Sequence, residues 1–161
     1  MKIWGSIGKK QQNNNNPRKR ILFVDDEKIV NEIIKDVLDD ENQFVTVASN
    51  GEDALALLKD NSFDLVISDV KMPGMDGIQL LSEIKKIDST IAVIMLTAFG
   101  DRELYLKAMS CGAAEYLNKP VGLYEIKSIV QQYLNRSGRF YMRRIKSKLR
   151  VLLSKMSARI I

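Results

Sequence analysis

Five short runs of apolar residues recur through the middle of the chain, and segments with helically spaced apolar residues separate them. The runs are continuous rather than alternating, which is typical of strands that are covered on both faces. Strands that alternate with helices predict a parallel sheet with right-handed crossovers, that is, a doubly wound α/β domain. The expected strands are 21–24, 44–47, 65–67, 91–96 and 113–117, and the expected helices are 29–38, 51–58, 78–84, 104–109 and 123–134.

Polar residues follow four of the five apolar runs. Asp25 and Asp26 follow the first run, Asp69 the third, Thr97 the fourth and Lys119 the fifth. In doubly wound sheets the functional site lies beyond the carboxyl ends of the strands. If these four strands have neighbouring ends, one crevice holds three carboxylates, a hydroxyl and an ammonium.

This set of side chains favours a particular chemistry. Three clustered carboxylates repel one another at neutral pH and need a cation or raised pKa values. Because the oxygen cluster includes no His or Cys, it suits Mg²⁺ or Mn²⁺ rather than zinc. Lys119 and Thr97 supply donors that could hold phosphoryl oxygens. The pattern therefore favours phosphoryl transfer with a carboxylate as the acceptor.

Composition excludes several other kinds of site. The chain has no His, which excludes a Ser-His-Asp or Cys-His site, His-ligated zinc and a phosphohistidine carrier. A single Cys excludes an internal disulfide framework. The longest purely apolar run is too short to span a membrane, and no secretory signal follows Met1, so we expect a cytoplasmic protein.

Residues 19–135 resemble the receiver domain of two-component response regulators. The resemblance is carried by Asp25-Asp26, Asp69 within the segment 66–77, Thr97-Ala98, Tyr116 and Lys119-Pro120, all in this order. It implies a flavodoxin-like, five-stranded parallel sheet in the order 2-1-3-4-5 with five flanking helices. It also implies a single-domain switch or relay intermediate rather than a turnover enzyme.

The resemblance assigns roles to individual residues. Asp69 is implied to be the phosphoacceptor, which takes the phosphoryl group from a phosphohistidine on a sensor histidine kinase or phosphotransfer protein, or from a small phosphodonor. Asp25, Asp26, Asp69 and the backbone carbonyl of Lys71 are implied to bind Mg²⁺. Lys119 is implied to pair with the phosphoryl group.

The resemblance also implies a switch and a lifetime for the phosphorylated state. Thr97 turns inward to hydrogen-bond the phosphoryl group, and Tyr116 follows into the space that it vacates, which changes the surface of the fourth helix, fifth strand and fifth helix. A homodimer through this surface is a family expectation, and the downstream protein target is unknown. The side chains of Lys71 and Phe99 flank the route of attacking water, and the bulk of Phe99 predicts slow self-hydrolysis.

Two other classes on the same fold fit the residues less well. A flavodoxin-like FMN carrier needs a phosphate loop rich in Ser, Thr and Gly after the first strand, where this chain has Asp25-Asp26-Glu27. An aspartyl phosphatase needs a second Asp two residues beyond its nucleophile. Position 71 is Lys, and position 27, which is two residues after Asp25, is Glu.

Charge divides the chain into three parts. Residues 1–20 carry six Lys/Arg and no acid, residues 21–135 carry ten Lys/Arg against twenty Asp/Glu, and residues 136–161 carry nine Lys/Arg and no acid. An acidic domain between basic flanks suggests different partners for each part. Residues 1–18 include an Asn-rich run and are expected to be a disordered leader.

Residues 136–161 predict a basic amphipathic helical tail. Its apolar residues recur at alternating spacings of three and four, and Lys and Arg lie mainly on the other faces. Three interpretations stay open: pairing with another helix or with the chain's own acidic domain, binding to an anionic membrane surface, or contact with nucleic acid. The last would make the protein a transcriptional regulator that contacts DNA, which is the alternative function. The apolar positions are Met142, Ile145, Leu149, Leu152 and Met156.

Overall fold

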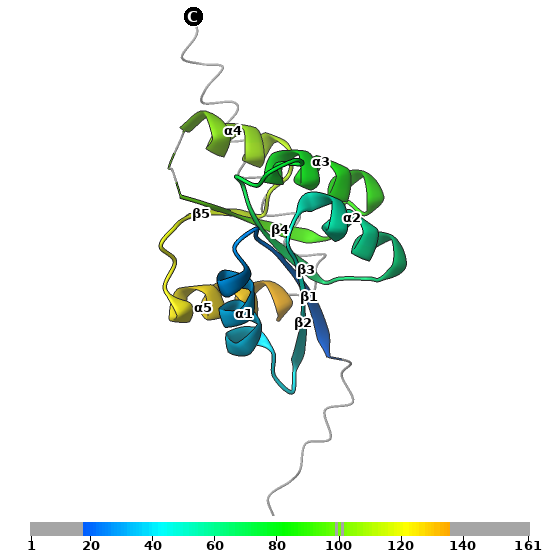
Figure 1. Ribbon diagram of the computed structural model, residues 1–161, viewed down its shortest axis with the longest axis vertical. Coiled ribbons are helices and arrows are strands. Elements are labelled where there is room, and N and C mark those ends of the chain that lie inside the picture. Colours follow the sequence, from blue (N-terminus) through cyan, green and yellow to red (C-terminus); the bar gives the residue numbers. More distant parts are fainter. Residues whose placement is uncertain (1–17, 99, 101, 136–161) are drawn as a thin grey trace, which may run out of the picture.

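A parallel five-stranded sheet in the order β2-β1-β3-β4-β5 forms the centre of the molecule (Figure 1). The computed structural model describes residues 18–98, 100 and 102–135. The predicted fold class and strand order are confirmed. The strands are β1 (Lys19–Val24), β2 (Gln43–Ala48), β3 (Leu65–Asp69), β4 (Ala92–Thr97) and β5 (Glu115–Asn118), and the helices are α1 (Lys28–Leu38), α2 (Gly51–Asp60), α3 (Gly77–Ile87), α4 (Arg102–Ser110) and α5 (Leu123–Leu134).

Helices cover both faces of the sheet. Figure 1 shows α1 and α5 on one face and α2, α3 and α4 on the other. The inner strands are therefore buried on both sides: Ile21 to Val24 in β1 are fully buried, and every residue of β3 is buried. This double cover explains why the strands are continuous apolar runs.

The fifth strand begins two residues later than the sequence pattern predicts. Ala113 lies instead in the cap that follows α4, because Gly112 adopts a φ of 96° and turns the chain out of the helix. The amide of Gly112 donates to Met109 O, and the amide of Ala113 donates to Ala108 O, a Schellman ending. The apolar run from Ala113 therefore combines a helix cap with a strand, which the pattern alone does not separate.

The two basic segments lie mostly outside the described residues. The leader over 1–18 and the tail over 136–161 thus remain predictions, apart from Arg18. Arg18 donates to an Asp39 carboxylate oxygen at 2.7 Å and lies over the Phe44 ring. Within the described part of the chain, no helix is both long and apolar enough to cross a bilayer.

Candidate functional site at the carboxyl edge of the sheet

Strand register brings the predicted polar residues to one edge. Val24 of β1 pairs with Ser68 of β3, so Asp25 follows β1 beside Asp69. Thr97 ends β4 and pairs with Asn118 of β5, so Lys119 comes next to Thr97. The amide of Lys119 donates to Thr97 O at 2.6 Å. The sheet geometry therefore places these residues together as the sequence predicted.

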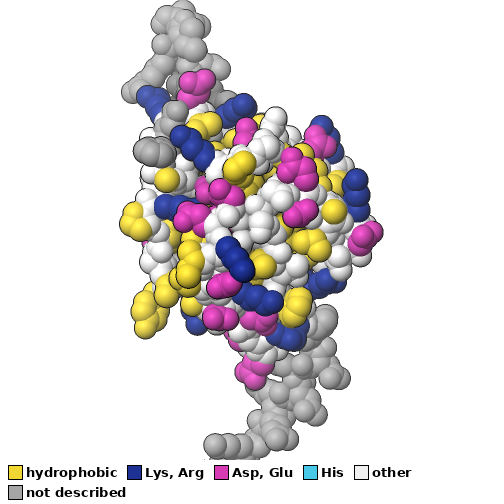
Figure 2. All heavy atoms as spheres, in the orientation of Figure 1, with side chains coloured by type: hydrophobic (Ala, Val, Ile, Leu, Met, Phe, Trp, Pro, Cys, Tyr) yellow, Lys and Arg dark blue, Asp and Glu magenta, His cyan; other side chains and the backbone are white. Residues whose placement is uncertain are grey.

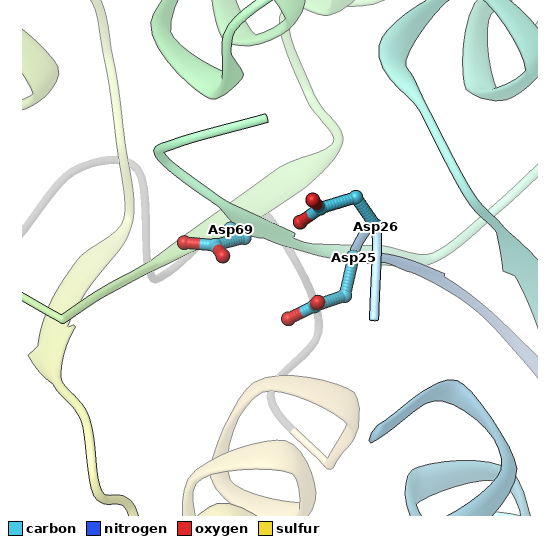
Figure 3. Close-up of side chains that lie close together, drawn as sticks. All are labelled: Asp25, Asp26 and Asp69. Atoms are coloured by element: carbon cyan, nitrogen blue, oxygen red, sulfur yellow. The ribbon is translucent and has the colours of Figure 1, made fainter. Parts of the chain in front are cut away.

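Three carboxylates converge at this edge. Asp25, Asp26 and Asp69 each offer one oxygen, and these oxygens all lie within 4.8 Å of one another. Figure 3 shows the three side chains gathered at the ends of β1 and β3. Asp25 is fully buried and Asp69 is 7 % exposed, whereas Asp26 is exposed. Two buried acids with one acid open to solvent form an oxygen set that fits a hard divalent cation with retained water ligands.

The ammonium of Lys119 bridges two of these carboxylates. It donates to Asp25 Oδ2 at 2.8 Å and to Asp69 Oδ2 at 3.0 Å. Burial lowers the pKa of Lys119, but the hydrogen bonds and charges of the two carboxylates outweigh burial, so its pKa lies above the ordinary value. Lys119 is therefore a firmly protonated cation in contact with both buried acids. The peptide bond from Lys119 to Pro120 is cis.

Backbone and helix contacts fix the position of Asp25. The Glu27 amide donates to Asp25 Oδ1 at 2.9 Å, and the buried Asn31 side chain donates to the Asp25 carbonyl at 2.7 Å. Sequence reasoning missed Asn31. It stands three residues before the buried Ile34 on α1, so a polar residue on an apolar helix face was the available signal.

The loop between β3 and α3 packs tightly against Asp69. A Cβ added to Gly77 would lie 2.1 Å from the Asp69 carbonyl oxygen, so only glycine fits there. Glu52 of α2 accepts a hydrogen bond from the Met75 amide at 3.2 Å, which ties the loop to the neighbouring helix. Asp76 caps α3 in a reciprocal capping box with Gln79. The sequence predicted a tight loop here but not its link to α2.

The other predicted site residues are placed as follows. Thr97 is buried at the end of β4, and the Lys71 amide faces Asp69 Oδ1 at 3.4 Å. Tyr116 is half-buried on β5, and its ring meets Tyr105 of α4 edge-on at 5.5 Å between centroids. Among the described residues, the buried hydroxyl of Tyr116 has no hydrogen-bond partner. Phe99 lies outside the described residues.

Comparison with known proteins identifies the family. The sequence profile of the response regulator receiver domain matches residues 21–131. The chain belongs to this family, and it is a phosphorylation-dependent response regulator of a two-component system. Receiver domains are phosphoacceptors that work with histidine kinases or phosphotransfer proteins. Nothing in the comparisons supports the DNA-contacting alternative, which rests on 136–161.

Individual relatives agree with this assignment. Sporulation initiation phosphotransferase F of Bacillus subtilis is 36 % identical over 115 residues, which are 71 % of this chain and 93 % of that protein. A CheY-like receiver domain protein from Methanospirillum hungatei superposes with a TM-score of 0.71 at 30 % identity, covering 73 % of this chain and 94 % of that chain. The response regulator TrrA of Thermotoga maritima, solved in complex with Mg²⁺-BeF, superposes with a TM-score of 0.64 at 37 % identity, covering 71 % of this chain and 98 % of that chain.

Proposed function

We propose that Asp69 is the phosphoacceptor of this response regulator. A carboxylate oxygen of Asp69 attacks the phosphorus of a phosphohistidine on a kinase or phosphotransfer protein. The new bond joins that oxygen to phosphorus while the bond from phosphorus to the imidazole nitrogen breaks, and the imidazole leaves with the bonding electron pair. The product is an aspartyl phosphate on Asp69, which water later hydrolyses to inorganic phosphate.

The observation that carries this proposal is the bridge made by Lys119. Its ammonium already contacts Asp69 at 3.0 Å, so it stands next to the oxygens of an incoming phosphoryl group. The second contact, to Asp25 at 2.8 Å, holds the ammonium in place from a fully buried carboxylate. A fixed cation beside the developing negative charge stabilises phosphoryl transfer without reorganisation.

We assign the divalent cation to Asp25, Asp26, Asp69 and the backbone carbonyl of Lys71. The oxygen-only carboxylate group supports this assignment, because hard cations such as Mg²⁺ or Mn²⁺ take oxygen ligands. When bound, the cation supplies positive charge that neutralises the phosphoryl oxygens. The exposed Asp26 leaves one side of the group open to solvent, from which a phosphodonor can approach.

Thr97 and Tyr116 carry the switch in this proposal. Thr97 hydrogen-bonds the phosphoryl group, and Tyr116 shifts toward the space that Thr97 leaves, which changes the surface of α4, β5 and α5. The half-buried ring of Tyr116 and its buried, unpartnered hydroxyl support this role, because its present position leaves a polar group unsatisfied. The protein then acts by binding a target in one state, and not as a turnover enzyme.

The test is phosphorylation by acetyl phosphate, measured by intact mass. We expect a single phosphoryl adduct that requires Mg²⁺ and is lost in Asp69→Asn. The matched control is Asp60→Asn, which changes an exposed aspartate at the end of α2 and is expected to retain the adduct. An adduct that persists in folded Asp69→Asn would refute the assignment of the phosphoacceptor.

A further inference from the structure

The basic tail over 136–161 and helix α1 are complementary in three respects. We propose that residues 136–161 dock on the outer surface of α1 and on the acidic turn that follows it. The occupant is thus a segment of this chain, and the surface is defined by Ile29, Ile33, Asp36, Asp40 and Glu41.

The first respect is exposed apolar area. Ile29 is 64 % exposed and Ile33, one helical turn later, is 46 % exposed. The two side chains form a ridge beside the partly buried Val30 and Val37. Figure 2 shows hydrophobic side chains exposed among charged ones on the α1 and α5 side of the domain. An apolar ridge of this kind fits the apolar side of an amphipathic helix.

The second respect is charge. Between Asp36 and Glu41 the chain carries four carboxylates and no Lys or Arg. Arg18 pairs with one of them, Asp39. Asp36 and Glu41 have no ion-pair partner among the described residues and are exposed. The tail carries nine Lys/Arg and no acid, so it matches this surface in sign.

The third respect is where the tail leaves the domain. Asn135 ends α5, and its side-chain amide donates to Gln131, whose own amide donates to Gln43 at 3.2 Å. Gln43 donates in turn to the carbonyl of Leu38, the last residue of α1, at 2.6 Å. A chain of side-chain hydrogen bonds therefore links the exit point to the end of α1, where the acidic turn begins.

The lengths also agree. Helix α1 has 11 residues and is about 16 Å long. Residues 136–141 reach up to about 20 Å when extended, and the apolar positions from Met142 to Met156 would span about 21 Å as a helix. A tail that turns back at the base of α5 can thus run antiparallel to α1 and cover both isoleucines. Of the other exposed apolar side chains, Phe44 lies on β2 with Arg18 over its ring. Leu123 and Tyr124 lie at the start of α5, far from its last residue, and Ile87 and Tyr105 lie on α3 and α4 across the sheet.

The test uses the full chain with a nitroxide on Ser147→Cys in a Cys111→Ser background, read by paramagnetic broadening of amide signals. Position 147 lies opposite the apolar side of the predicted tail helix, so the label leaves the contact intact. We expect strong broadening of the amides of α1 and of residues 39–41, and little broadening across α3. Raising the salt concentration should weaken the effect, since the acidic turn contributes by charge.

Two exposed isoleucines give a matched pair of variants. Ile33→Ser should reduce the broadening of α1 at least severalfold, because burial of one isoleucine is worth about tenfold in binding. Ile87→Ser, at a side chain of similar exposure on the other face, should leave it unchanged. Broadening that survives Ile33→Ser, that spreads evenly, or that is absent would overturn the proposal. In a mixture of labelled and unlabelled molecules, broadening that arises only between molecules would place the tail on a second copy. That outcome would also overturn the proposal.

Discussion

Replacing Lys119 by Met tests whether its ammonium holds the site together. The change removes hydrogen bonds of 2.8 Å to Asp25 and 3.0 Å to Asp69 and leaves two buried carboxylates beside each other without that cation. Methionine keeps the length and apolar part of the side chain, so packing changes little. The variant therefore isolates the effect of charge.

Burial sets the magnitude of the loss, and the direction of the pKa shift of Lys119 sets the pH range over which it applies. Removing one partner of a buried ion pair costs about 3–5 kcal/mol, and we take the lower end because the Lys119 side chain is 22 % exposed. Because the pKa of Lys119 is raised, its stabilising contribution is complete below the ordinary value of 10.5 and is lost only as pH rises above it. At neutral pH without metal we expect a loss of about 3 kcal/mol, or about 10 °C in Tm.

Mg²⁺ should reverse part of this loss. The variant lacks one positive charge beside the carboxylates that would hold the cation, and after screening that difference is worth about 1 kcal/mol, or about fivefold tighter Mg²⁺ binding. Thermal unfolding followed by circular dichroism, in EDTA and in MgCl₂, measures both effects. Lys85→Met is the matched control, because Lys85 is also partly buried but donates to the backbone carbonyl of Ile91 instead. Equal stability of Lys119→Met and wild type in EDTA, or an equal response to Mg²⁺, would refute the reasoning.

Substitutions at Gly77 and Lys85 test a close contact beside the site and a partly buried charge on α3. Gly77→Ala should lower the free energy of unfolding by about 2 kcal/mol in chemical denaturation, because its Cβ would lie 2.1 Å from the Asp69 carbonyl oxygen. The control Gly122→Ala, whose Cβ would meet nothing closer than 4.0 Å, should change that free energy by under about 0.5 kcal/mol. Equal effects of the two variants would contradict the clash at Gly77. Burial lowers the pKa of Lys85, and the charge of the nearby Asp88 offsets this only in part. The free-energy cost of burying the charged Lys85 ammonium is therefore complete at neutral pH and is relieved as pH rises toward 10.5. Wild type should therefore gain stability relative to Lys85→Met over that alkaline range in pH-dependent unfolding, and a gain on acidification would show that the sign is wrong.

The elements and most of the site could be predicted because two sequence signals reinforce each other. The continuous apolar runs mark strands covered on both faces, and chemistry-bearing residues stand directly after four of those runs. In a parallel sheet all such positions lie at one edge, so Asp25 and Asp69 are neighbours because β1 and β3 pair. Lys119 follows β5, and its long side chain reaches both carboxylates past the end of β4. The strand order itself came from the family resemblance, because apolar runs do not say which strands pair.

Contacts made by loops and caps were less predictable. The apolar run at Ala113 predicts only a strand, because a Schellman ending buries an alanine just as a strand does. The link from Glu52 to the Met75 amide depends on how α2 lies against the loop after β3, and no local spacing encodes that arrangement. Tyr116 could be placed on β5, but its edge-on contact with Tyr105 depends on the packing of α4.

Asn31 shows why part of the site geometry follows from the backbone. The Asp25 carbonyl lies just past the end of β1, where the strand ladder stops and a buried carbonyl needs another donor. The Asn31 side chain supplies that donor at 2.7 Å from the next helix. The carbonyl that accepts this hydrogen bond and the carboxylate that contacts Lys119 both belong to Asp25. The hydrogen bond from Asn31 to the Asp25 carbonyl therefore also helps to fix the direction of the Asp25 side chain. In this structure a polar residue on the buried face of α1 therefore satisfies the backbone at the end of β1 and helps to position the site.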